Sequence, residues 1–225
     1  MLIFFSHIPK AGGKTLLQSF DYAYGLQNVL KIYEKPFGDV AQDEFDRLSA
    51  SEIKNKSAVA GHLRMKYFLS NNYAKEEFVA GRVRLLTSIR DPIDRLISYY
   101  NFVYWNSKHP LHQNVRSADP VDFLINQPAN YQLGFLRPDP STSMDFVVSN
   151  FYVFPMSKSI DGFRNFFMNL GVDIPSLEIV NKTTELSGGK EILRRSDLEV
   201  RVLDRLKNMH REDLDFFDCV NNTYQ

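Results

Sequence analysis

Short apolar runs alternate with amphipathic runs along this chain. The run from Leu2 to Phe5 is apolar enough for a buried strand, and Leu16, Leu17, Phe20 and Tyr24 then recur at the spacing of one helix face. The same order, an apolar run followed by helical spacing, returns in later parts of the chain. Strands that alternate with helices form a parallel sheet with helices on both faces. The pattern therefore predicts an α/β fold of three layers around a central, mostly parallel sheet.

Later strands and helix starts follow from the same pattern. Four further apolar runs are predicted strands: residues 57–60, 83–89, 151–154 and 177–180. Three helix starts are predicted from capping residues: Asp91 with Pro92, Ser159, and Ser196 with Glu199. We expect the helix after Pro92 to pack on the sheet and the helix after Ser159 to stop at Gly171.

Two stretches carry weaker signals. In residues 25–56, charged residues are mixed with turn residues, and we expect a surface excursion with one short helix near Phe45. Residues 106–150 are rich in turn residues, with one helical turn expected to start at Asp119. Neither stretch is predicted to add a strand.

Length and composition restrict the class of protein. With 225 residues, the chain is expected to form a single domain, residues 1–225. Basic and acidic residues number 27 each, so no global field attracts nucleic acid or an anionic membrane, and an anion site must be local. The single cysteine, Cys219, excludes an intrachain disulfide framework and a cysteine zinc cluster.

Metal and membrane sites are not indicated by the pattern. The histidines lack the helical His-x-x-x-His spacing of a metal site, so no metal is expected. No apolar run reaches the roughly 20 residues of a membrane-spanning helix, and a strand starting at Leu2 leaves no room for a signal peptide. We therefore expect a cytoplasmic protein.

Residues 8–16, Ile-Pro-Lys-Ala-Gly-Gly-Lys-Thr-Leu, join the first strand to the first helix. Gly12 and Gly13 let backbone N–H groups approach an anion, and the positive end of the new helix points to the same place. Further donors come from Lys10, Lys14 and Thr15. The segment is predicted to bind one anionic group, although a Gly-Gly pair after a strand can also be only a turn.

These residues do not complete the P-loop of nucleoside triphosphatases. That motif, G-x-x-x-x-G-K-[ST], needs a glycine five residues before Gly13, where this chain has Ile8. Residues 8–16 resemble instead the 5′-phosphosulfate loop of sulfotransferases that use 3′-phosphoadenosine 5′-phosphosulfate (PAPS), in the carbohydrate-type form IPK-x-G-G-T-[ST]-[LF]. Lys14 departs from that form. The resemblance implies a P-loop nucleotide-hydrolase-like fold and PAPS as co-substrate.

The resemblance also implies roles for the loop residues. Lys10 would contact the 5′-phosphosulfate and assist departure of the leaving group. The implied cofactor cradle consists of Lys10, Ala11, Gly12, Gly13, Lys14, Thr15 and Leu16. Lys14 is either an additional phosphosulfate ligand or the first solvent-facing residue of the helix.

A second motif lies at residues 90–98, Arg-Asp-Pro-Ile-Asp-Arg-Leu-Ile-Ser. It is similar to the segment RDP-x-x-R-x-x-S of PAPS sulfotransferases, which implies that Arg90 and Ser98 bind the 3′-phosphate. A guanidinium at a strand end and a hydroxyl on the following helix can converge on one phosphate. The alternative is that Arg90 pairs with Asp94 and that Ser98 is a neutral helix residue.

Transfer to a hydroxyl requires a general base. Gly61-His62 resembles a Gly-His pair that supplies the catalytic histidine in related carbohydrate sulfotransferases, so His62 is the predicted base. A neutral imidazole can accept the hydroxyl proton near neutral pH. A histidine at a strand end is also often structural, and His7, beside the phosphate loop, is the rival candidate.

Two further segments resemble the family. Residues 181–184, Asn-Lys-Thr-Thr, are similar to the segment that closes over the nucleotide, which implies cofactor contacts for Lys182 and Thr183. Residues 130–136 resemble the acceptor-side segment N-x-Q-x-x-x-L, and residues 106–150 are expected to form the acceptor-side wall.

The combined motifs predict an O-sulfotransferase that moves a sulfuryl group from PAPS to an acceptor hydroxyl of a carbohydrate. A P-loop kinase and a non-catalytic nucleotide-binding protein are the alternatives. The spacing of the histidines predicts no metal cofactor, and the balanced charge predicts no nucleic-acid partner. Because animal members of the family are typically Golgi membrane proteins, a trimmed form of such an enzyme is the alternative to a cytoplasmic protein.

Overall fold

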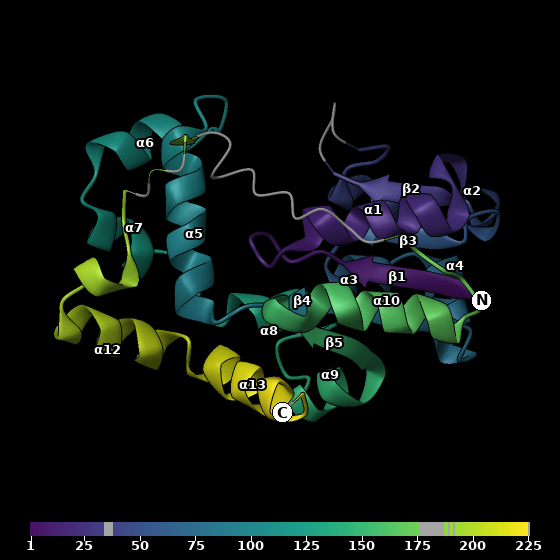
Figure 1. Cartoon of the computed structure of the whole chain (residues 1–225). Coiled ribbons are helices and arrows are strands. Elements are labelled where there is room, and N and C mark those ends of the chain that lie inside the picture. Colours follow the sequence, from purple (N-terminus) through teal and green to yellow (C-terminus); the bar gives the residue numbers. More distant parts are fainter. Residues whose placement is uncertain (34–37, 176–186, 189, 191, 225) are drawn as a thin grey trace.

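A five-stranded sheet in which all neighbouring strands run parallel lies at the centre of the fold (Figure 1). The computed structural model describes residues 1–33, 38–175, 187, 188, 190 and 192–224. In the order β2-β3-β1-β4-β5 across the sheet, the strands are Val29–Ile32, Ala58–Gly61, Leu2–Ser6, Val83–Ile89 and Phe151–Pro155. The sequence-based strands at 2–5, 57–60, 83–89 and 151–154 are confirmed.

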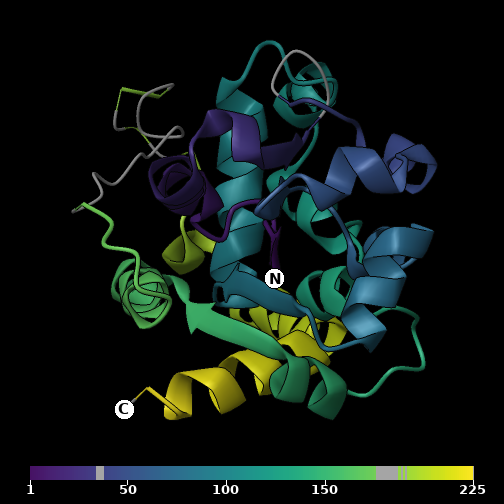
Figure 2. The same ribbon diagram turned by 90° about the vertical axis from the view of Figure 1, so that its right-hand side faces the viewer.

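Helices cover both faces of the sheet, as the three-layer prediction requires (Figure 2). One face carries α1 (Gly13–Tyr24) and α10 (Ser159–Asn169). The helices and 3₁₀ turns of the opposite face are η2 (Gln42–Arg47), α2 (Ala50–Lys54), α3 (Met65–Phe68), α4 (Asn72–Val79), α8 (Tyr131–Leu136), α9 (Met144–Asn150) and α13 (Arg211–Asn222). None of the helices in the described ranges combines the length and apolar character needed to cross a bilayer.

Alternation along β1 divides the core between the two faces. Phe4 stacks on Phe68 with ring centroids 4.2 Å apart, whereas Phe5 packs against Phe20 and Phe163 at 5.3 and 5.1 Å. Successive side chains of a strand point to opposite faces, so a strand covered on both sides is apolar throughout. This explains why β1 reads as a continuous apolar run.

The helix after Pro92 does not pack on the sheet, so that prediction is wrong. This helix, α5 (Pro92–Trp105), forms a separate apolar cluster with α6 (His112–Ser117), α7 (Pro120–Ile125) and α12 (Val200–Met209), to the left of the sheet in Figure 1. The apolar face of α5 is buried, as its spacing requires, but other helices cover it. Helical periodicity identifies a buried face without identifying its partner.

The prediction for residues 25–56 is also wrong, because this stretch contains a strand of the sheet. β2 pairs with β3 at the sheet edge, and Val29 and Ile32 are buried. Phe45, placed on a surface helix by the prediction, is fully buried in η2. Four residues of strand are too short to show a period, so only the pairing partner identifies β2.

Capping residues predicted one helix start correctly and two imperfectly. Asp91 caps α5 by accepting hydrogen bonds from Ile93 N and Asp94 N at 2.9 and 3.0 Å. Ser159 is the first residue of α10 rather than its cap. Helix α12 begins after Glu199, because Ser196 lies in a preceding 3₁₀ turn, η4 (Arg195–Asp197).

Other expectations along the chain have mixed outcomes. The predicted helix stop at Gly171 is confirmed, since α10 ends just before it and Gly171 has φ 76°. Residues 106–150 contain α6, α8 and α9 in addition to the predicted helical turn, which is α7. The short 3₁₀ turns η1 (Leu26–Asn28) and η3 (Met156–Lys158) complete the described elements. The predicted strand at 177–180 lies outside the described residues.

Gly61 ends β3 at a point where no side chain fits. Its φ is 144°, and an added Cβ would lie 2.2 Å from the carbonyl oxygen of Ile32. That oxygen accepts a hydrogen bond from His62 N at 2.8 Å, and Gly61 O accepts one from His7 N at 2.8 Å. The glycine therefore allows β1, β2 and β3 to end close together.

We expect Gly61→Ala to lower the free energy of unfolding by about 2 kcal/mol or more, because both the backbone conformation and the contact with Ile32 O are strained. Gly134→Ala is the matched control, since nothing lies within 4 Å of its added Cβ and it sits inside α8. Alanine there should raise stability by about 0.5 to 1 kcal/mol. Urea denaturation measures both, and equal changes would contradict this account of Gly61.

Candidate active site

The segments that follow β1, β3 and β4 meet at the carboxyl edge of the sheet and are tied together by short polar contacts. Thr87 Oγ1 donates to Ser6 O at 2.9 Å, and Ser6 Oγ donates to Leu63 O at 3.0 Å. Ser88 Oγ donates to Ala11 O at 2.7 Å. In α/β sheets this edge is where ligands bind. The contacts bring the phosphate-loop residues, His62 and Arg90 to one region.

The loop from Ile8 to Gly13 adopts a backbone shape that suits an anion. Lys10 has φ 70° and Gly12 has φ 85°, and left-handed backbone at a non-glycine residue such as Lys10 is typical of functional sites. Gly12 is the N-cap of α1, and no side chain caps this helix within the described chain. The first N–H groups of α1 and the positive end of its dipole are thus presented at the loop.

Both glycines of the loop are required by close neighbours. A Cβ on Gly13 would lie 2.0 Å from Cδ2 of His7, and a Cβ on Gly12 would lie 2.9 Å from Cγ of Met156. The His7 ring therefore forms the floor of the loop, and the backbone can approach a ligand from the other side. This cradle fits a phosphate or sulfate group, as the sequence suggested.

The remaining loop side chains have different environments. Ala11, Thr15 and Leu16 are buried, and Lys14 is exposed. Lys10 is partly exposed, and its Nζ lies 4.4 Å from the ring centroid of Phe102 on α5. Lys14 thus faces solvent in the first turn of α1.

His62 belongs to a cluster with His7 and Tyr33. The His62 ring centroid lies 4.7 Å from that of His7 and 4.5 Å from that of Tyr33, and His7 Nδ1 is hydrogen-bonded to the Tyr33 hydroxyl. Because the His7 ring touches the position beside Gly13, the cluster connects His62 to the phosphate loop. His7, the rival candidate for the base, is thus the histidine that packs beneath the phosphate loop.

Burial sets the charge state of this cluster. It lowers the pKa of His62 to about 4. The pKa of His7 is held well below its usual 6.5 by burial, then by the nearby His62 and Lys10. Burial also raises the pKa of the Tyr33 hydroxyl. Both imidazoles are therefore neutral at pH 7, which is the form that accepts a proton.

Arg90 lies between the end of β4 and the start of α5, and Ser98 is partly exposed in the second turn of α5. Asp94, the partner that the alternative interpretation gave to Arg90, forms an ion pair with Arg195 at 3.2 Å. Arg195 also pairs with Asp91 at 3.2 Å. Arg90 therefore directly precedes α5 and Ser98 lies in its second turn, in the order that the motif requires.

The sequence did not indicate the partner of the Arg90 backbone. Gln132, in the segment that resembles the acceptor side of the family, donates from Nε2 to Arg90 O and accepts from Arg90 N. A second unforeseen residue is Arg64, two positions after His62, whose guanidinium lies 5.6 and 5.5 Å from the rings of Tyr131 and Phe135. No local signal marks contacts between residues so far apart in the chain.

The predicted ligands Lys182 and Thr183 lie outside the described residues. The structure therefore brings together the phosphate loop, His62 and the Arg90 motif, and these three parts form the candidate active site.

Comparisons with known proteins identify the family. A family model described as "Sulfotransferase family" matches residues 2–127, which include the phosphate loop, His62 and residues 90–98. The fold is similar to that of the crystal structure of mouse sulfotransferase SULT7A1 complexed with PAP, with a TM-score of 0.55 and 15% identity over 98% of this chain and 88% of that chain. No curated protein matches the chain. Because the family model covers more than half of the 225 residues, the chain belongs to the sulfotransferase family.

Proposed function

We propose that this sulfotransferase moves a sulfuryl group from PAPS to a hydroxyl of a carbohydrate acceptor. The observation that carries the proposal is the convergence of three parts at one sheet edge: an uncapped helix N-terminus with Lys10, a neutral His62, and the Arg90 motif. An anion cradle, a proton acceptor and a second phosphate site are the parts that transfer from a doubly phosphorylated nucleotide requires.

Each part has a proposed role toward the nucleotide. The 5′-phosphosulfate is assigned to Lys10 and the backbone of residues 11–16, with Lys14 at the exposed rim. The 3′-phosphate is assigned to Arg90 and Ser98. The resemblance adds Lys182 and Thr183 as further nucleotide contacts. Bound PAPS supplies the sulfuryl group to be transferred.

In the proposed in-line transfer, the residues of the site have separate tasks. The acceptor oxygen forms its bond to sulfur while the bond between sulfur and the bridging phosphate oxygen breaks, and His62 takes the hydroxyl proton. Lys10 and the N–H groups of α1 stabilise the negative charge that develops on the leaving phosphate. These contributions are positioning, proton transfer and electrostatics, as in phosphoryl transfer.

The carbohydrate acceptor is proposed from the form of the phosphate loop, which resembles the carbohydrate-type enzymes. Arg64, two positions after His62, is partly exposed, and its guanidinium lies over the rings of Tyr131 and the buried Phe135. The Arg64 cation can donate hydrogen bonds to a hydroxyl or an anionic substituent of a sugar.

A kinase is the less favoured candidate. Asp91, the residue that could have held magnesium, caps α5 and pairs with Arg195. Its carboxylate thus has a structural role that competes with metal binding.

The first test compares ligands by thermal shift. At about 100 times its Kd, 3′-phosphoadenosine 5′-phosphate (PAP) should stabilise the chain by about 2.7 kcal/mol, or roughly 5 to 10 °C in Tm. ATP with magnesium at the same concentration should give a much smaller shift. The reverse order would support the kinase. Radiolabelled sulfate transfer to a panel of saccharides then separates an enzyme from a nucleotide-binding protein without activity.

The second test concerns the base. We expect His62→Ala to lower kcat by roughly a hundredfold or more, because the imidazole that takes the proton of the acceptor hydroxyl is then missing. The affinity for PAP should be unchanged. The matched variant His7→Gln removes the other imidazole of the cluster. If His7→Gln abolishes turnover and His62→Ala does not, the assignment of the base is wrong.

The pH profile gives the same test an independent measurement. Since the pKa of His62 is about 4, the imidazole becomes protonated only as the pH falls toward that value. The kcat/KM of the unmodified enzyme should therefore stay constant from neutral pH down to about pH 5 and fall below it. A fall centred near 6.5 would contradict a buried His62 base.

The third test concerns the 3′-phosphate. Arg90→Ala should weaken PAP binding by about tenfold to a hundredfold, the value of a charge-assisted phosphate contact, and leave AMP binding almost unchanged. Arg84→Ala is the matched control, because Arg84 is an exposed arginine of β4, the strand that leads to Arg90. Equal losses for PAP and AMP in the Arg90 variant would show that Arg90 is structural.

A further inference from the structure

The backbone of Arg90 lies just beyond the ladder between β4 and β5. The last paired residues of that ladder are Ile89 and Pro155, and α5 begins three residues after Ile89, at Pro92. The amide of Gln132 takes over at this point, accepting from Arg90 N at 3.0 Å and donating to Arg90 O at 2.8 Å. Both polar groups of the Arg90 backbone are therefore held by one side chain.

Few side chains can make this pair of bonds. A primary amide offers a donor and an acceptor side by side, whereas a carboxylate only accepts and a thioether is only a weak acceptor. Gln132 is fully buried, so water does not replace a missing partner easily. The contact specifies glutamine, or a side chain with the same two functions, at this position.

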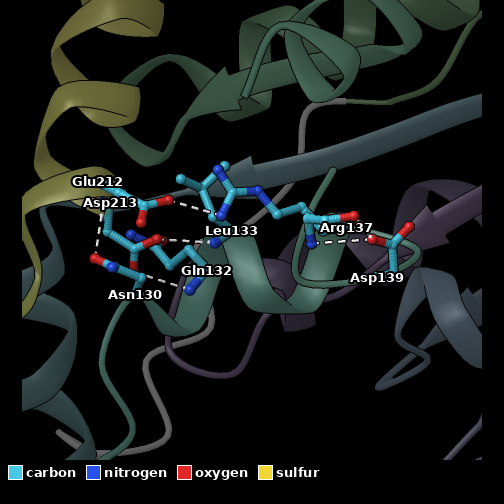
Figure 3. Close-up of polar contacts among 8 residues, drawn as sticks. Asn130, Gln132, Leu133, Arg137, Asp139, Glu212 and Asp213 are labelled. Atoms are coloured by element: carbon cyan, nitrogen blue, oxygen red, sulfur yellow. Dashed lines mark hydrogen bonds and ion pairs between the residues drawn. The ribbon is translucent and has the colours of Figure 1, made fainter. Parts of the chain in front are cut away.

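Gln132 is itself fixed by Asp213, the third residue of α13 (Figure 3). The two carboxylate oxygens of Asp213 accept from Gln132 N at 2.9 Å and Leu133 N at 2.8 Å, two N–H groups in the first turn of α8. In return, Asn130 Oδ1 accepts from Asp213 N at 3.3 Å. Each helix thus caps the start of the other, although the residues are about 80 positions apart.

Burial of this carboxylate has a cost. Asp213 has no exposed surface, and burial raises its pKa to about 6 in spite of the two backbone hydrogen bonds and the nearby Arg95 and Arg137. A carboxylate that caps a helix at the protein surface stays in contact with water and avoids this cost. The fold therefore contains a buried carboxylate, which is unfavourable by itself, at the position that orients the start of α8 and the Gln132 side chain.

We propose that Gln132 is a positioning residue that aims the Arg90 guanidinium at the 3′-phosphate, and that Asp213 holds Gln132 for this task. The inference rests on the role proposed above for Arg90 in nucleotide binding. A backbone fixed on both its N–H and its C=O leaves the arginine fewer orientations, so less entropy is lost when it meets the phosphate. Residues outside the segment matched by the family model thereby complete the nucleotide site.

The test measures the ratio of AMP to PAP dissociation constants by calorimetry. In Gln132→Met, which keeps the length of the side chain and removes both hydrogen bonds, the ratio should fall about tenfold. The ratio should fall by a similar factor in Gln132→Glu, because a carboxylate oxygen then faces Arg90 O. In Asp213→Asn the ratio should fall by a smaller factor. Glu212→Gln is the matched control: it removes the neighbouring surface pair with Arg137 and should leave the ratio unchanged.

A double-mutant cycle separates the two proposals. If Gln132 acts through Arg90, then Gln132→Met should not reduce the ratio further in the Arg90→Ala background. A normal ratio in Gln132→Glu and Asp213→Asn, with Arg90→Ala impaired, overturns the positioning role and leaves the proposed function intact. An unchanged ratio in Arg90→Ala overturns both the 3′-phosphate assignment and the inference. If the Gln132 and Asp213 variants lose stability but keep a normal ratio, the contacts from Asp213 through Gln132 to Arg90 are structural only.

Discussion

Parallel pairing of β1 with β3 on one side and β4 on the other is the constraint on which the site depends. Parallel strands bring their carboxyl ends to one edge, so segments more than 50 residues apart in the chain arrive side by side. The contacts of Ser6, Thr87 and Ser88 across that edge then hold the segments in register. Without this pairing, the phosphate loop, His62 and Arg90 would have no common location.

Close packing beneath the loop links the shape of the site to its electrostatics. Gly13 gives space to the His7 ring, and the ring in turn separates the loop from Tyr33 and His62. The same packing buries His7, leaves His62 only partly exposed, and keeps both imidazoles uncharged. The proposed anion cradle of helix N–H groups and lysines thus lies beside neutral imidazoles, because burial opposes the charged form of an imidazole.

The helices beyond the sheet edge extend this arrangement. α5 leaves the sheet after Arg90 and builds its own apolar cluster with α6, α7 and α12. Arg195 fastens the chain before α12 to the start of α5, and Asp213 fastens α13 to α8. The C-terminal part of the chain therefore supports the start of α5 from two directions, although it is remote in sequence.

The sequence by itself determined the strands with continuous apolar runs, the cap at Asp91, the phosphate-loop motif and the α/β class, because each depends on neighbours within a few residues. Tertiary structure alone decided that β2 joins the sheet, that α5 leaves it, and that Gln132 holds Arg90. Those outcomes depend on partners tens of residues away. Local spacing shows which face of an element is apolar and which groups need hydrogen bonds, but the partner is selected by how the elements pack.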